Sequence, residues 1–204
     1  MTAIGLSYPF KRQYNFIFEG DSITNGAGLT VPIETFAFQL VAKRAIQKKN
    51  SCNYQNLSAN GATIVSMIAN VNVFDALYST DFYSNYAILL AGTNDIGTEE
   101  DEASTVHTNL STWIAGRKAT GFITIILTLT PRSYLGDPEG TQTKIDALNT
   151  LIRADKCGAN LLVDLAANQY LDDPNDTTYF LDKLHITAVG CGVIADLINE
   201  VLLP

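Results

Sequence analysis

The sequence predicts an α/β fold in which helices cover both faces of a parallel β-sheet. Short apolar runs alternate with amphipathic stretches about five times along the chain, as in consecutive strand–helix–strand units. Two of the runs, "YAILLA" (Tyr86–Ala91) and "FITIILTL" (Phe122–Leu129), are apolar almost throughout, as strands buried on both faces are. No repeat or linker interrupts the 204 residues, so we expect one domain over residues 1–204.

Five strands are expected from the apolar runs. The second of them is the weakest, because polar residues interrupt it, whereas the third and fourth are the clearest. In chain order the expected strands are Tyr14–Phe18, Asn53–Leu57, Tyr86–Ala91, Phe122–Leu129 and Asn160–Asp164.

The stretches between the strands have apolar residues at helical spacing. In Thr35–Lys48, for example, Phe36, Leu40 and Val41 fall on one face. The other expected helices are Ala62–Val71, Ala103–Ala119 (closed by Gly121), Gln142–Asp155 and Thr187–Leu203.

Composition excludes several classes of function. The hydrophobic fraction of 47% and charged fraction of 17% are typical of an ordered globular protein. A net charge of -8 argues against nucleic acid or an anionic membrane as partner, since both bind basic surfaces. Oligomeric state is left open, and the expected partner is a small-molecule or carbohydrate substrate.

The three cysteines and the N-terminus add further expectations. Cys52, Cys157 and Cys191 are too few for a disulfide scaffold, and no Cys/His cluster indicates a metal site. "MTAIGLSYPFKRQ" lacks the apolar core of a signal peptide, and no run approaches the roughly 20 apolar residues of a membrane span. We expect a soluble protein, cytoplasmic by default, or secreted if a leader was removed.

Polar turns rich in glycine follow three of the expected strands. They are Gly20-Asp21-Ser22, Asn60-Gly61 and Gly92-Thr93-Asn94-Asp95. In a parallel sheet the carboxyl ends of the strands share one edge, and ligands bind there. We therefore expect these three turns to meet.

A serine hydroxyl becomes a strong nucleophile only when a base accepts its proton. The chain has two histidines, and His107 falls inside an amphipathic helix, where a surface or half-buried helix residue is the plain interpretation. His185 lies in an irregular stretch three residues after Asp182, which is close enough for the carboxylate to orient the imidazole. A capping or packing role is the alternative for His185.

A Ser–His pair oriented by a carboxylate also needs donors for the oxyanion of a tetrahedral intermediate. The candidates are the Gly61 N–H, the Asn94 side-chain amide and the N–H of Ser22 itself. A simple turn glycine and an Asx-turn are the alternatives for the first two.

Four blocks occur in a fixed order: "EGDSIT" (Glu19–Thr24), "SANGAT" (Ser58–Thr63), "AGTNDIG" (Ala91–Gly97) and "DKLH" (Asp182–His185). Together they resemble the SGNH hydrolase superfamily, also called the GDSL esterases/lipases. The resemblance spans nearly the whole chain. Ile23 replaces the leucine of the GDSL form, which is a conservative change, and Thr24 excludes the Gly-x-Ser-x-Gly elbow of the α/β-hydrolases.

The resemblance implies roles for particular residues. Ser22 would be the nucleophile, His185 the general base and Asp182 its orienting acid, with Ser22, Gly61 and Asn94 forming the oxyanion hole. It also implies a flavodoxin-like three-layer α/β/α sandwich with no metal and no cofactor.

The substrate is less well defined by the sequence. The loops after Gly92 and before Asp182 are polar, which favours short-chain acyl esters, above all acetyl esters, with a carbohydrate as one carrier. A lysophospholipase or thioesterase of the same family is the alternative. From a different class, a catalytically silent glycan-binding module also fits.

Overall fold

The computed structural model describes residues 12–48 and 52–202, and its centre is a five-stranded parallel sheet. The strand order is β2-β1-β3-β4-β5, the flavodoxin-like order of doubly wound sheets. The predicted fold class is therefore confirmed. The strands are β1 (Arg12–Gly20), β2 (Cys52–Asn56), β3 (Phe82–Leu90), β4 (Ile123–Leu127) and β5 (Leu161–Val163).

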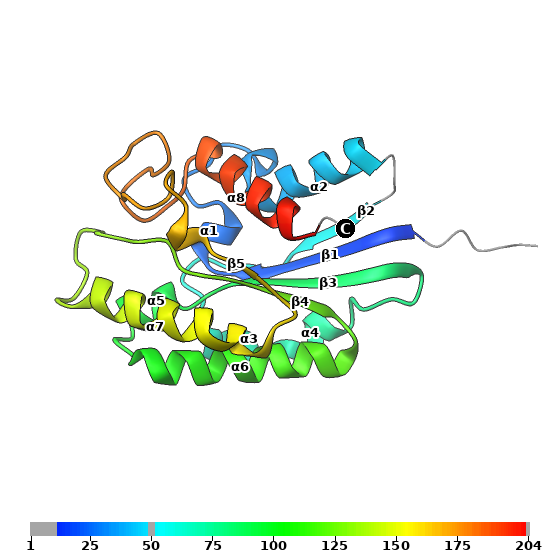
Figure 1. Ribbon diagram of the computed structural model, residues 1–204, viewed down its shortest axis with the longest axis horizontal. Coiled ribbons are helices and arrows are strands. Elements are labelled where there is room, and N and C mark those ends of the chain that lie inside the picture. The colour runs from blue at the N-terminus through cyan, green and yellow to red at the C-terminus, as the bar shows by residue number, and fades with distance from the viewer. Residues whose placement is uncertain (1–11, 49–51, 203–204) are drawn as a thin grey trace, which may run out of the picture.

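Helices cover both faces of this sheet and make the three layers visible in Figure 1. Helices α2 (Phe36–Lys48) and α8 (Ala188–Val201) pack together on one face. The other face carries α3 (Ile64–Ala69), α4 (Val71–Asp75), α6 (Ala103–Thr120) and α7 (Thr141–Asp155). Short helices α1 (Ser22–Asn25) and α5 (Thr93–Gly97) follow β1 and β3, and 3-10 turns span Pro32–Glu34, Lys156–Gly158 and Leu165–Ala167.

The helix expected over Ala62–Val71 differs from the observed structure. Thr63 caps α3 by accepting a hydrogen bond from the Ser66 N–H, so the helix begins two residues later than expected. It ends at Ala69, and a second short helix, α4, starts after Asn70. Residues 1–11 of the N-terminal stretch and Leu203, the expected end of the last helix, lie outside the described residues.

The core lies on both sides of the sheet and is formed by the strands and the inner faces of the helices. Phe18 and Phe36 meet edge to face on one side, and Phe74 and Trp113 do so on the other. Gly121, at φ +111°, ends α6 as the sequence predicted, because a left-handed residue satisfies the last carbonyls of a helix.

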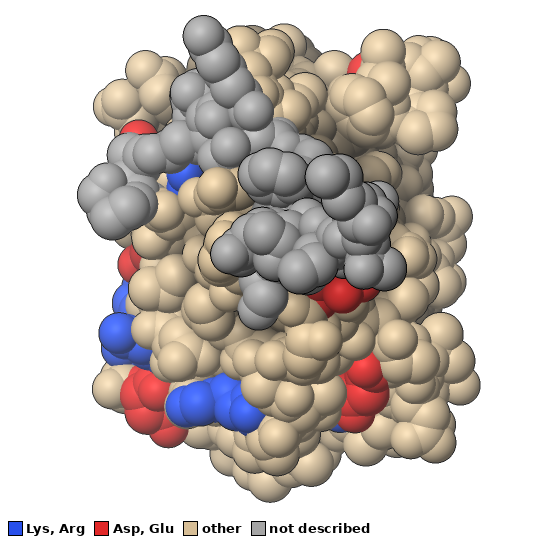
Figure 2. Space-filling view, turned by 90° about the vertical axis from the view of Figure 1, so that its right-hand side faces the viewer, with Lys and Arg blue, Asp and Glu red and all other residues tan. Residues whose placement is uncertain are grey.

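All three cysteines lie in the described part of the chain, and no disulfide joins them. Cys157 and Cys191 are buried and Cys52 is half-buried. In residues 12–48 and 52–202, no helix is long and apolar enough to cross a bilayer. Figure 2 shows the end of the molecule where β1 begins, and there acidic and basic residues are intermingled among uncharged ones.

Candidate active site

Ser22 lies at the carboxyl end of β1, where the chain turns into α1. The turn requires glycine at position 20, since a Cβ there would come within 2.5 Å of the Leu90 carbonyl oxygen. The Asp21 side chain then accepts a hydrogen bond from the Ile23 N–H at 2.9 Å and caps α1. Ser22 is the first residue of this helix and keeps 8% of its surface exposed.

His185 and Asp182 extend from Ser22 in a continuous line of hydrogen bonds. The Ser22 Oγ lies 3.0 Å from His185 Nε2, and Asp182 Oδ2 lies 2.7 Å from His185 Nδ1. With the carboxylate accepting from Nδ1–H, Nε2 is left as the acceptor for the serine hydroxyl. The structure therefore brings together the three residues predicted as a triad, across 163 residues of sequence.

The segment that carries His185 is a tight loop fixed by its own backbone. The Leu181 N–H donates to the His185 carbonyl at 2.7 Å, and Lys183 adopts φ +68° at the turn. Asp182 Oδ1 accepts from the backbone N–H of His185 at 2.8 Å. Partial burial works to raise the pKa of Asp182, but the hydrogen bonds from the backbone and ring of His185 outweigh it, so the pKa is lowered and the carboxylate stays ionised.

The candidate oxyanion donors Gly61 and Asn94 line the same cleft as Ser22 and His185, which has a volume of about 630 Å³. Gly61 has φ +74°, a conformation that favours glycine. The Asn94 Nδ2 donates to the Ala62 carbonyl at 3.0 Å, which ties the turn after β3 to the Gly61 loop, residues 57–63 between β2 and α3. One N–H of the Asn94 amide remains for another acceptor.

Sequence reasoning missed Arg132, which also lines this cleft and is only 6% exposed. Its Nη1 donates to the carbonyl of Thr93 at 3.0 Å, and its Nε donates to Asp137 Oδ2 at 2.9 Å. Arg132 therefore joins the turn beside Asn94 to the loop after β4. The only sequence signal was a cation placed just after the fourth strand.

His107 lies away from the cleft, on α6, and is half-buried as the plain interpretation of its helix predicted. Its Nε2 lies 2.9 Å from Asp155 Oδ1 at the end of α7. The ligand atoms of these two residues and the buried Cys157 lie within 4.8 Å of one another. His107 thus links two helices and does not contribute to the cleft.

Two buried carboxyl groups, Asp21 and Asp95, adjoin Ser22 and Asn94 in the chain. Burial raises the pKa of Asp21 to about 7, even though it accepts a hydrogen bond from Ile23. Burial likewise raises the pKa of Asp95 to about 6, although the Ile64 N–H donates to its Oδ1 at 3.0 Å. Asp95 holds the first turn of α3, so it fixes the far end of the Gly61 loop.

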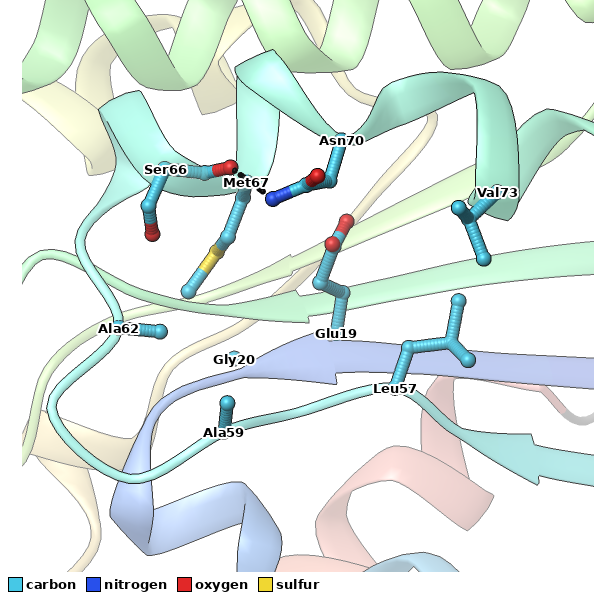
Figure 3. Close-up of a pocket in the computed structure, with 9 residues that line it drawn as sticks. All are labelled: Glu19, Gly20, Leu57, Ala59, Ala62, Ser66, Met67, Asn70 and Val73. Carbon is cyan, nitrogen blue, oxygen red and sulfur yellow. Dashed lines mark hydrogen bonds between the residues drawn. The ribbon is translucent and has the colours of Figure 1, made fainter.

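A third such carboxyl group, Glu19, lies in a cavity of about 270 Å³ behind the Gly61 loop. Figure 3 shows its side chain rising from β1 toward Asn70 on the helical layer. Trp113 Nε1 donates to Glu19 Oε2 at 2.7 Å. Burial outweighs this bond and raises the pKa of Glu19 to about 7.

Comparison with known proteins decides the family. The model of the GDSL-like Lipase/Acylhydrolase family matches residues 18–192, which include all four sequence blocks. The chain belongs to this family. A search of the curated proteins finds no match.

Solved structures have the same fold as this GDSL hydrolase. A member of the lipolytic G-D-S-L family from Veillonella parvula has a TM-score of 0.75 at 22% identity, over 93% of this chain and 98% of that one. LAE5, from the metagenome of Lake Arreo, has a TM-score of 0.73 at 21% identity, over 95% and 96%. The acetylxylan esterase Axe2 from Geobacillus stearothermophilus has a TM-score of 0.72 at 16% identity, over 95% and 97%.

Proposed function

We propose that this GDSL hydrolase is a serine esterase that cleaves short-chain acyl esters, above all acetyl esters. Ser22 is the nucleophile, His185 the general base and Asp182 the group that orients it, within one catalytic domain over residues 1–204. The observation that carries the proposal is the line from Asp182 Oδ2 through the imidazole to Ser22 Oγ, with steps of 2.7 and 3.0 Å. Both distances are within hydrogen-bond reach, as nucleophile activation requires.

The first half-reaction forms an acyl-enzyme. Ser22 Oγ bonds to the ester carbonyl carbon while its proton passes to His185 Nε2. The carbonyl oxygen becomes an oxyanion, which the N–H groups of Ser22 and Gly61 and the amide of Asn94 stabilise. The bond from carbon to the alcohol oxygen then breaks, and His185 returns the proton to that oxygen, so the alcohol leaves neutral.

The second half-reaction releases the acid. A water molecule gives a proton to His185 Nε2 and its oxygen bonds to the acyl carbon. The bond to Ser22 Oγ breaks, the serine regains the proton from His185, and the carboxylic acid departs. Asp182 stabilises the imidazolium that forms twice per cycle, which suits a carboxylate with a lowered pKa.

Support for a short acyl group comes from the cleft and from the relatives. The lining of the cleft includes the polar residues Asn60, Thr98 and Arg132. Such a lining suits an acetyl group, because an acetyl group needs little apolar surface to bind. Axe2 and the acetyl xylan esterase AlAXEase are among the structural neighbours, so an acetylated carbohydrate is one carrier that fits.

Labelling with a fluorophosphonate probe, followed by peptide mapping, tests the mechanism. We expect one adduct on Ser22 that is lost in His185→Ala and in Ser22→Ala, with both variants folded. Folded wild-type protein that takes no adduct would overturn the proposal and favour a silent glycan-binding module.

A series of p-nitrophenyl esters tests the acyl length. We expect the highest kcat/KM for acetyl or another short acyl group. A maximum beyond about eight acyl carbons would favour the lysophospholipase or thioesterase alternative.

A further inference from the structure

A second groove, of about 650 Å³, adjoins the catalytic cleft. It lies between Ser133–Leu135 on one side and Pro174–Lys183 on the other, two loops at the carboxyl edge of the sheet (Figure 1). Large apolar side chains are exposed here: Leu135 to 93%, Leu181 to 45% and Tyr134 to 40%. Phe180 and Pro174 complete the apolar part of its lining.

The groove borders the catalytic cleft and shares two lining residues with it. Tyr134 and Leu135 line both spaces, and Asp182 lines the groove. The Tyr134 ring meets the His185 ring edge to face, with centroids 6.3 Å apart. The Ser133 N–H donates to the Lys183 carbonyl at 3.1 Å and holds the two walls together. The groove therefore starts at the His185 side of the cleft.

The proposed chemistry determines which part of the ester faces this side. His185 must pass its proton to the oxygen of the departing alcohol, so that oxygen has to lie next to Nε2. The carbonyl oxygen points the other way, toward Gly61 and Asn94. The body of the alcohol therefore continues past His185 toward Tyr134 and the groove.

We propose that this groove binds the alcohol part of the ester and selects alcohols with an alkyl or aryl body. This inference rests on the proposed esterase function and specifies its substrate. Its basis is the apolar lining. An alkyl or aryl group bound over the exposed faces of Leu135 and Leu181 removes apolar surface from water, which is favourable. Asp182 is the acidic group of the groove, and both its oxygens accept hydrogen bonds from the His185 loop.

Two isomeric esters separate the alcohol side from the acyl side. Hexyl acetate and ethyl hexanoate contain the same atoms, so they have matched size, and each is compared with ethyl acetate. We expect kcat/KM to rise roughly two- to fourfold per added methylene of the alcohol, and so at least about 16-fold over the four methylenes from ethyl to hexyl acetate. A monoacetylated xyloside serves as the polar alcohol.

The groove residues are tested by Leu135→Ala, Leu181→Ala and the double variant. We expect the ratio of hexyl to ethyl acetate to fall at least about threefold in the double variant, while the ratio of ethyl hexanoate to ethyl acetate does not change. Ile46→Ala, at a 78% exposed position on α2, is the matched control and keeps both ratios. Leu135 is almost fully exposed, so its variant tests the groove without a loss of folding.

The outcomes separate the two proposals. If the protein cleaves esters but kcat/KM does not rise with the length of the alcohol, or is highest for the xyloside, the groove inference is overturned and the esterase proposal is retained. The groove inference is also overturned if kcat/KM rises with alcohol length but the leucine variants do not change that rise. No ester turnover and no label on Ser22 overturn both.

Discussion

The side-chain amide of Asn94 donates a hydrogen bond to the Ala62 carbonyl across 3.0 Å. The next residue, Asp95, accepts from the Ile64 N–H at 3.0 Å, so the turn after β3 holds the Gly61 loop at two points. The two candidate oxyanion donors outside Ser22 are thus positioned by contact with each other's loops. In the proposed oxyanion hole, Asn94 would therefore act both as a donor to the oxyanion and as a tether of the loop that carries Gly61.

Replacing Asn94 by alanine removes both a donor and a tether. We expect Asn94→Ala to lower kcat about 10²- to 10³-fold with a much smaller change in KM, since the interaction forms mainly in the transition state. Steady-state kinetics with p-nitrophenyl acetate measure it. Asn25→Ala, which breaks an exposed hydrogen bond to Asn60 at 2.8 Å, is the control and is expected to change kcat less than about twofold. A kcat for Asn94→Ala equal to wild type would remove Asn94 from the oxyanion hole.

Gly61 and Gly116 form a matched pair for glycine-to-alanine substitution. An added Cβ meets nothing within 4 Å at either site, but Gly61 has φ +74° whereas Gly116 lies inside α6. We expect Gly61→Ala to cost about 1 kcal/mol of unfolding free energy and to reduce kcat, because the loop must shift.

Gly116→Ala should instead stabilise the protein by about 0.5–1 kcal/mol with kcat retained, since alanine is the better helix former. Urea unfolding and esterase assays on both variants measure the difference. Equal kcat in the two variants would show that the Gly61 backbone does not contact the reacting ester.

Asp182→Asn tests how His185 is oriented. The amide oxygen can still accept from the backbone N–H groups of Leu184 and His185, so the loop should keep its shape. Its NH₂ group would donate to Nδ1 and place the ring proton on Nε2, which then cannot accept from Ser22. We expect a loss of about 10³–10⁴ in kcat. Asp172→Asn, in the same irregular region, should retain activity, and a similar loss there would point to general damage.

Three raised carboxyl pKa values predict an unusual dependence of stability on pH. The folded protein holds protons on Glu19 and Asp21 up to about pH 7 and on Asp95 up to about pH 6. The unfolded chain releases them near pH 4. The folded state therefore binds more protons between pH 4 and 7, and unfolding free energy should fall by a few kcal/mol as pH rises through this range.

Below about pH 4 the trend reverses. Asp155, Asp164 and Asp182 have lowered pKa values, so their stabilising contributions are lost as they become protonated. Urea unfolding at pH 3 to 8 should show a maximum near pH 4–5. Asp21→Asn keeps an acceptor for the Ile23 N–H and removes one titrating group. Its unfolding free energy should therefore fall less steeply from pH 4 to 7 than that of the wild type. An identical slope in this variant would exclude Asp21 as a cause of the pH dependence.

Periodicity predicted the long elements well because their burial is regular. The two runs that are apolar almost throughout became β3 and β4, and the amphipathic stretches became α2, α6, α7 and α8 within a few residues. It missed α1, α4 and α5, which have four or five residues and so complete little more than one turn. Such helices depend on caps and tertiary contacts that have no sequence period.

In the candidate site, too, the sequence predicted some residues and missed others. Its blocks could be located because each follows a strand or lies in a short motif, and the parallel sheet brings such turns to one edge. Arg132 could not be predicted from the sequence, because its place in the cleft depends on hydrogen bonds to Thr93 and Asp137 that only the folded structure shows. The burial of Glu19 could not be predicted either, because its hydrogen-bond partner Trp113 is 94 positions away in the sequence.

Ser22 and His185 are 163 positions apart in the chain, and this separation also sets the order in which a ribosome makes the two residues. Ser22 emerges with the first strand, whereas the imidazole follows the last strand, which ends at Val163. A nascent chain stopped at residue 180 would contain every strand of the described residues and both candidate oxyanion residues after Ser22, yet it would lack His185, the proposed base. In the proposed mechanism, the nucleophilic hydroxyl is therefore made well before the imidazole that activates it.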